Sequence, residues 1–205
     1  MNLLSWIVLP MMIQTASIGS NSELYGIIRV TKQFVGNSSI GPDPTFGVAR
    51  PITGYVAFHQ ETSTSQTLLE INLQGFLPNK VHGIHIHQKR IENNNCSGTE
   101  GHYNPLRTNH GGPNDVIRHH GDLGNITSDA TGSVLVNITD RLITMTDKNT
   151  IIGKSFVIHA KGDVPTSYDG NAGDSIACGN IVQVSGSWGS NANLLLAFWI
   201  FLIHI

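Results

Sequence analysis

The sequence predicts a single all-β domain built as an antiparallel sandwich or barrel of eight short strands. Apolar and β-branched residues recur in short runs separated by Gly, Asn, Asp and Pro, and no stretch keeps a helical period. A chain of 205 residues with 40% hydrophobic content fills one core. The expected strands are Tyr25–Gln33, Thr53–His59, Thr67–Leu73, Val81–His87, Ser133–Ile138, Leu142–Met145, Lys154–Ala160 and Ile176–Val184.

Three connections between these strands are long. Gly36–Pro51 is rich in Pro and Gly, whereas Gln88–Asn125 and Lys161–Asp174 carry most of the polar side chains. Long loops on a compact all-β frame are usually functional, so we expect the chemistry in the last two. The net charge of -2, with scattered charges and no basic stripe, argues against a nucleic-acid partner.

The N-terminal segment, residues 1–20, is typical of a secretory signal peptide. An apolar run at Leu3–Ile13 is followed by small residues, although no Lys or Arg precedes the run. The alternative is an ordinary buried helix. We expect the mature domain to span residues 21–184, and the acceptor triplets at Asn37, Asn95, Asn125 and Asn137 fit a secreted glycoprotein.

The C-terminal segment, residues 185–205, ends in the apolar run LLLAFWIFLIHI behind several small residues. The run is too short for a helix across a bilayer of about 30 Å, which needs about 20 residues. It suits the removable tail of a GPI-anchor signal, and the alternatives are a C-terminal helix or an amphipathic appendage. We therefore expect a protein that is secreted or held by a lipid anchor at the extracellular face of the plasma membrane.

Cys96 and Cys178 are the chain's two cysteines. In an oxidising compartment one disulfide is the simplest account, and two free thiols are the alternative. The chain-entropy model assigns the long loop that such a bond closes a stabilisation on the order of 4 kcal/mol.

The chain has ten histidines, most of them within residues 82–120, and this clustering indicates metal binding. Within Val81–His87, which reads V-H-G-I-H-I-H, side chains of a strand alternate between faces. His85 and His87 therefore point to one side, where one metal ion can use both. His82 lies on the apolar face, and we interpret it as a structural histidine.

The loop after this strand supplies His102, His110, His119 and Asp122. Three imidazoles and one carboxylate are a plausible tetrahedral zinc set, and nearby Gly and Pro let the loop fold back to bring them together. His159, at the end of another apolar strand, could join His85 and His87 in a site of nitrogen donors, which copper favours.

Taken together, the motifs G-I-H-I-H, C-S-G-T-E-G-H-Y-N-P, N-H-G-G-P, H-H-G-D-L-G-N and G-N-A-G-D-S-I-A-C-G resemble the copper/zinc superoxide dismutase family over residues 25–184. The resemblance implies an eight-stranded Greek-key β-barrel, related to immunoglobulin-like sandwiches, with a disulfide between Cys96 and Cys178. It implies copper ligands His85, His87, His102 and His159, and zinc ligands His102, His110, His119 and Asp122. His102 would bridge the two ions, and Asp163 would link one ligand of each metal.

The resemblance also implies the reaction, which converts the superoxide anion to dioxygen and hydrogen peroxide by copper redox cycling, with His102 carrying a proton. The alternative is a non-catalytic copper- and zinc-binding cell-surface protein. A purely structural adhesion domain would leave the ligand set unexplained.

The chain departs from the family at three places. Ser175 stands where the family has the arginine that docks the anionic substrate, and the electrostatic loop Lys161–Asp174 is shorter than is usual there. Since charge-lined clefts accelerate association, we expect slower dismutation, with Lys161 as a candidate to compensate. Gln88–Arg90 places two cations where relatives have an apolar dimer contact, so we expect a monomer or a differently arranged dimer.

Overall fold

The computed structural model describes residues 24–30, 48–61, 66–93 and 95–183. This part of the chain contains one short 3₁₀ helix, η2 (Cys96–Thr99), and nine strands. The strands are β1 (Leu24–Val30), β2 (Val48–Gln60), β3 (Thr67–Phe76), β4 (Val81–His87), β5 (Asp122–Thr127), β6 (Ser133–Asp140), β7 (Ser155–His159), β8 (Ser175–Asn180) and β9 (Val182–Gln183).

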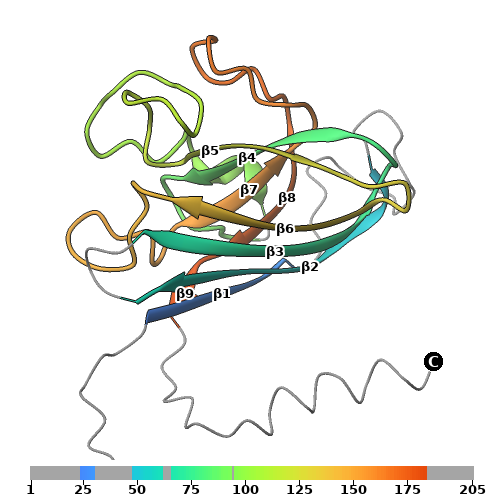
Figure 1. Ribbon diagram of the computed structural model, residues 1–205, viewed down its shortest axis with the longest axis horizontal. Helices are drawn as coiled ribbons and strands as arrows, with labels where there is room; N and C mark the ends of the chain where they lie inside the picture. Colours follow the sequence, from blue (N-terminus) through green and yellow to red (C-terminus); the bar gives the residue numbers. More distant parts are fainter. Residues whose placement is uncertain (1–23, 31–47, 62–65, 94, 184–205) are drawn as a thin grey trace, which may run out of the picture.

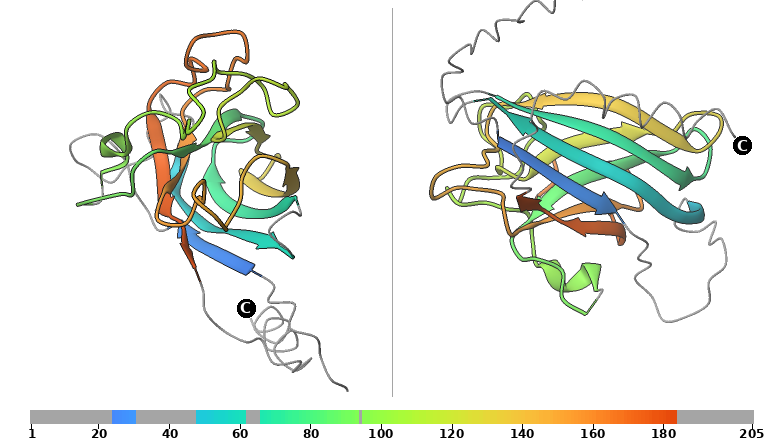
Figure 2. Two further views of the ribbon diagram at one scale, coloured as in Figure 1. Left: turned by 90° about the vertical axis from the view of Figure 1, so that its left-hand side faces the viewer. Right: turned by 90° about the horizontal axis from the view of Figure 1, so that it is seen from below.

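The strands form two antiparallel sheets that face each other as layers (Figure 1, Figure 2). One sheet has the order β6-β3-β2-β1-β9 and the other β5-β4-β7-β8. Alternating apolar side chains of both sheets fill the space between them; for example, Phe58 meets Phe156 edge to face, with ring centroids 6.4 Å apart. The all-β fold class expected from the sequence is confirmed.

Four of the eight predicted strands lie within observed ones, Lys154–Ala160 exceeds β7 by one residue at each end, and one prediction has no strand in the structure. The prediction of a strand at Leu142–Met145 was wrong, because this segment forms only an isolated bridge between Thr144 and Thr150. Ile143 and Met145 are buried, as a strand pattern requires, but the backbone N–H of Met145 donates to the side-chain oxygen of Gln60 at 2.9 Å. A side chain thus satisfies the backbone group that a neighbouring strand would otherwise bind.

A strand was also missed. The predicted loop Gln88–Asn125 contains the start of β5, which pairs antiparallel with β4 and places Asp122 opposite His85. Asp, Gly and Asn in its sequence are typical of a loop, and only pairing with β4 makes the segment extended. The predicted strand Ile176–Val184 is divided into β8 and β9, and Val184 lies outside the described residues. Residues 31–33, the end of the predicted strand Tyr25–Gln33, also lie outside them.

The two polar loops lie on the same side of the molecule (Figure 1) and both contribute to the lining of one pocket, although they leave the antiparallel strands β4 and β7 at opposite ends. Residues 88–121 connect β4 to β5, and residues 160–174 connect β7 to β8. A disulfide between Cys96 and Cys178 fastens the first loop to β8. The segments expected to be a signal peptide and an anchor tail, and the triplet at Asn37, lie outside the described residues.

No helix within the described ranges is long and apolar enough to cross a membrane.

Candidate metal centre

Two neighbouring strands supply three of the histidines. His85 and His87 point from β4 to one side, and His159 ends β7, which pairs with β4. All three are buried. Nε2 of His87 lies 3.2 Å from Nε2 of His159, and the ring centroids of His85 and His159 are 4.9 Å apart. The alternation expected for this strand therefore brings both imidazoles to one point.

Backbone bonds from the long loop to β4 position His102. It forms an isolated bridge with His87, and its neighbour Tyr103 donates its N–H to the carbonyl of Ile86 at 2.7 Å. The carbonyl of Gly121 accepts the N–H of Ile86 at 2.9 Å, and a Cβ at Gly121 would lie only 2.2 Å from the oxygen of Ile86. The close contact between the loop and β4 therefore requires glycine at position 121. In this arrangement the ring of His102 stacks on that of His85, with ring centroids 3.7 Å apart.

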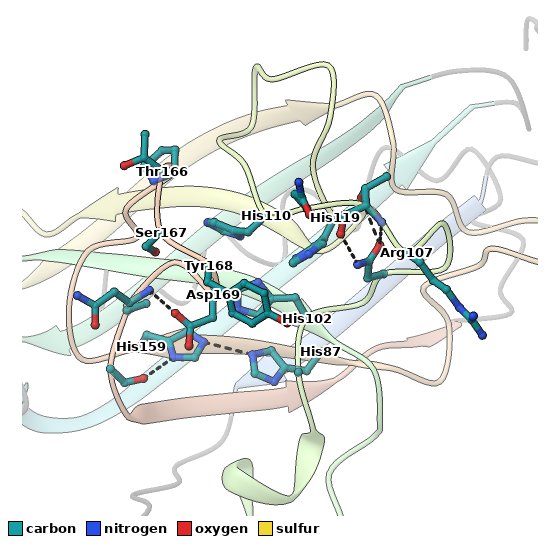
Figure 3. A pocket seen from close by; sticks show the side chains of 18 residues that line it. His87, His102, Arg107, His110, His119, His159, Thr166, Ser167, Tyr168 and Asp169 are labelled. Atoms are coloured by element: carbon teal, nitrogen blue, oxygen red, sulfur yellow. Dashed lines mark hydrogen bonds between the residues drawn. The ribbon is translucent and has the colours of Figure 1, made fainter.

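The donor atoms fall into two groups of four that share one member. Within each group the ligand atoms lie within 4.8 Å of one another. We call the first group the copper set (His85, His87, His102 and His159) and the second the zinc set (His102, His110, His119 and Asp122), after the metals that each donor type suits. Figure 3 shows His102 between the histidines of the two sets.

Hydrogen bonds identify the ring nitrogens that are left for a metal in the copper set. Nε2 of His85 lies 3.0 Å from an oxygen of Asp163, and Nδ1 of His87 and of His159 lie 2.5 Å and 2.9 Å from backbone carbonyls. Each of these nitrogens donates, which leaves the opposite nitrogen with its lone pair. Nδ1 of His85 is buried and has no hydrogen-bond partner within the described residues, as expected of a metal donor.

The environment keeps these imidazoles neutral, as metal ligation requires. Burial lowers the pKa of His85 to about 3 and that of His87 to about 2, with further lowering from the neighbouring histidines. Burial lowers the pKa of His159 as well. A cluster of neutral nitrogen donors therefore fits a copper ion.

Asp122 is the centre of the zinc set. Its Oδ1 lies 2.8 Å from Nδ1 of His102 and 3.1 Å from Nδ1 of His119, and its Oδ2 lies 3.1 Å from Nδ1 of His110. Although burial opposes the charged form, the bonds to the three histidines lower the pKa of Asp122 far below its usual range. Three imidazoles around one ionised carboxylate match the donors and the coordination number of a structural zinc site.

Asp163 joins the two sets. The same oxygen, Oδ1, contacts Nε2 of His85 at 3.0 Å and Nε2 of His110 at 3.1 Å. Burial opposes its ionisation, but the two histidines lower its pKa to about 2. Gly170 makes room for this contact at a φ of +80°, and a Cβ there would lie 2.1 Å from Oδ1.

Two supporting residues were missed in the sequence. The buried Arg118 donates to the backbone carbonyls of His119 and Asp122 at 3.0 Å and 2.9 Å, and it pairs with Asp140 of β6. Asn125 holds the backbone of Asp163 through its side-chain amide. Arg118 could have been noticed because it directly precedes His119, a residue of the zinc set. Nothing in the local sequence distinguishes Asn125 from an ordinary loop residue.

An open pocket of about 1180 Å³ leads to the histidines, and its lining includes His87, His102, His110, His119 and His159. Asp169 and the exposed Tyr168 form part of its rim. Ser175 lies opposite His159 in the β7–β8 pair and is therefore beside the copper set. Arg107 also lines the pocket, but Figure 3 shows its side chain extending away from the histidines.

Comparison with known proteins agrees with this geometry. The family described as "Copper/zinc superoxide dismutase (SODC)" matches residues 52–181. Superoxide dismutase [Cu-Zn] of Humicola lutea is 39% identical over 137 residues, which cover 63% of this chain and 90% of that protein.

Two extracellular proteins are similar as well. Extracellular superoxide dismutase [Cu-Zn] of Drosophila melanogaster is 39% identical over 137 residues, 63% of this chain and 75% of that protein. Its namesake in Caenorhabditis elegans is 40% identical over 142 residues, 65% of this chain and 62% of that protein. The chain therefore belongs to the copper/zinc superoxide dismutase family.

Proposed function

We propose that this protein is a superoxide dismutase that acts outside the cell. The observation that supports the proposal most strongly is that His102 belongs to two adjoining sets of four donors, each within 4.8 Å. In this proposal the copper set would hold one copper ion and the zinc set one zinc ion, and His102 is the donor that the two sets share.

When bound, copper supplies reversible one-electron chemistry, which oxidises one superoxide to dioxygen and reduces a second to peroxide. His102 carries one of the protons that the second step requires. Its Nδ1 lies 2.8 Å from Asp122 on the zinc side, so Nε2 is the nitrogen that faces the copper set and exchanges the proton. The second proton comes from water in the open pocket.

The remaining residues orient these donors. His85, His87 and His159 are held in one tautomer by Asp163 and by the carbonyls of Glu100 and Gly173. Preorganised donors need little rearrangement when the charge on the site changes. Asp163 also couples the orientation of His85 to that of His110 across the two sets.

We expect dismutation that is slower, and less weakened by salt, than that of relatives with an arginine at the position of Ser175. Asp169 lines the pocket and Arg107 points away from the histidines, so the approach to the copper set lacks an inward-facing cation among the pocket residues described. Positively lined clefts raise association rates by about 10–10³. The stem of Lys161 packs at about 3.5 Å from the site of a Cβ on Gly173, which places it near the rim as a partial substitute.

The alternative function is non-catalytic metal binding at the cell surface, and the serine at position 175 together with Asp169 favours it. The two proposals are distinguished by metal analysis and pulse radiolysis on the secreted protein and on Ser175→Arg, with Ser175→Gln as an uncharged control. Dismutation by the unchanged protein, abolished by His102→Ala, supports the enzyme. Activity that arises only in Ser175→Arg supports the alternative.

Secretion and a lipid anchor belong to this proposal, and the extracellular relatives support the first. We also propose a monomer or a differently arranged dimer. Lys89 and Arg90 are exposed, and Lys89 pairs with Glu100 at the surface at 2.6 Å. Burying these cations in an apolar interface would be costly. Light scattering tests this, and a tight dimer through Gln88–Arg90 would contradict it.

A further inference from the structure

We propose that the folded protein uses its glycosylation triplets selectively: Asn137 carries an N-linked glycan and Asn125 does not. The inference rests on the proposed passage through the secretory pathway, but it is independent of dismutation. Both asparagines are exposed and both begin an Asn-Ile-Thr triplet, so neither exposure nor the motif separates them. The two asparagines differ in whether the side-chain amide is engaged in hydrogen bonds.

Asn137 lies on β6, the outer strand of the five-stranded sheet. Side chains alternate along this strand, so Val134 is buried while Leu135, Asn137 and Thr139 point outward. Among the described residues, none forms a hydrogen bond with the side chain of Asn137. Its amide is therefore free to carry a sugar.

Leu135 gives the glycan a physical role. It is 77% exposed and lies two residues before Asn137 on the same outward face, about 7 Å away along the strand. An apolar side chain on an outer strand invites pairing with another chain, and proteins protect such edges with charge or with a covering group. A bulky, hydrated glycan on Asn137 would cover Leu135 and block this edge.

The amide of Asn125 is bound on one edge by a single backbone residue. Its Nδ2 donates to the carbonyl of Asp163 at 3.0 Å, and its Oδ1 accepts the N–H of the same residue at 2.6 Å. Nδ2 carries two hydrogens, one on the same side of the C–N bond as Oδ1 and one on the opposite side. Only the hydrogen on the side of Oδ1 can bind Asp163 while Oδ1 binds the same residue, so this hydrogen forms the bond to the carbonyl of Asp163.

Glycosylation would replace this particular hydrogen. In the reaction, Nδ2 bonds to the anomeric carbon of a lipid-pyrophosphate-linked oligosaccharide, the carbon–oxygen bond to pyrophosphate breaks, and Nδ2 loses one proton. The secondary amide that forms prefers the trans geometry by about 2.5–4 kcal/mol, which places the sugar on the side of Oδ1. A sugar there would displace the carbonyl of Asp163, whose side chain joins the two metal sets.

The test is site mapping on the full chain, secreted from eukaryotic cells and purified from the medium. Glycans are removed by peptide N-glycosidase in heavy-oxygen water, which converts each glycosylated Asn to labelled Asp, and peptides are read by mass spectrometry. We expect the label at Asn137 and none at Asn125. Label at Asn125, or its absence from Asn137, would overturn the inference.

Two matched variants remove one triplet each and leave the asparagines in place. Thr139→Ala should lower the mass of the secreted protein by one glycan, whereas Thr127→Ala should leave it unchanged. The Thr139→Ala protein should also self-associate more at high concentration, and adding Leu135→Lys should reverse this. Equal mass loss in both variants, or none in Thr139→Ala, would contradict the inference.

A dismutase assay on the same preparations keeps the two proposals apart. Inactive protein with a glycan on Asn137 would refute the enzymatic function alone. Active protein without that glycan would refute only the inference.

Discussion

Oδ1 of Asp163 lies 3.0 Å from Nε2 of His85, and the same oxygen contacts His110 at 3.1 Å. One carboxylate atom thus orients a histidine of each metal set. Asp163 belongs to the loop between β7 and β8, whereas His85 and His110 come from β4 and from the loop between β4 and β5, so this contact connects three separate segments of the chain.

Removing the charge of this link should weaken metal binding. We expect Asp163→Asn to bind zinc and copper 10–100-fold more weakly, because such supporting contacts fix ligand orientation. Competition with chelators of known affinity measures the change. Asp169→Asn is the matched control in the same loop, since Asp169 lines the pocket without an ion pair to the ligand histidines, and it should bind both metals normally.

The buried pair of Arg118 and Asp140 should matter for stability. Arg118→Met leaves the carboxylate of Asp140 buried without its partner, which costs about 3–5 kcal/mol. Urea unfolding of the metal-free protein measures the loss. The exposed Arg141 provides the control, and Arg141→Met should change the free energy of unfolding by about 0.5 kcal/mol or less. Equal effects of the two substitutions would contradict the prediction.

The disulfide should stabilise the fold and the loop that carries His102. Cys96 and Cys178 are 82 residues apart, so the chain-entropy model predicts a loss on the order of 4 kcal/mol for the double change to Ser. Thr99 donates to the carbonyl of Cys96 at 2.6 Å and contacts His87 at 3.0 Å, which connects the bond to the copper set. Reduced unchanged protein is the comparison, and an unfolding midpoint insensitive to reduction would contradict the prediction.

The metal-free protein should lose stability as pH falls from 7.5 to 5. Burial depresses the pKa of His85 to about 3, that of His87 to about 2, and that of His159 as well. In the unfolded chain these groups bind protons near pH 6.5, so their contribution is present above that pH and declines below it.

His110 opposes this trend. Burial alone would lower its pKa, but Asp122 and Asp163 raise it to about 9, so its contribution is complete below about pH 6.5 and disappears as pH rises through 9. Burial also lowers the pKa of His82 and His120, so five lowered imidazoles outweigh one raised one and the Tm should fall on acidification. Calorimetry of the metal-free protein between pH 7.5 and 5 measures the Tm, and a Tm that stays constant or rises on acidification would contradict the prediction. Protein loaded with zinc and copper should show a steeper fall, because protons also compete with the metals.

The strands that could be predicted from the sequence are those with a clear local alternation of apolar and polar residues. Strand β4 has the bounds predicted for Val81–His87, because a period of two with turn residues on either side is a local property. β5 was missed and Leu142–Met145 was predicted in error, because both outcomes depend on partners distant in the chain. β4 imposes an extended backbone on Asp122–Thr127, and Gln60 satisfies the backbone of Met145 in place of a strand.

The family motifs, the all-β class and the residue types of the candidate metal donors could be derived from the sequence alone, because spacing and donor chemistry are local properties of the chain. The folded structure was needed to establish which ring nitrogen of His85 contacts Asp163, that Arg118 supports the zinc set, and that the side-chain amide of Asn125 binds the backbone of Asp163. Each of these depends on a hydrogen bond between residues that meet only when loops and strands pack, and the direction of a side chain in space is not encoded by its neighbours in sequence.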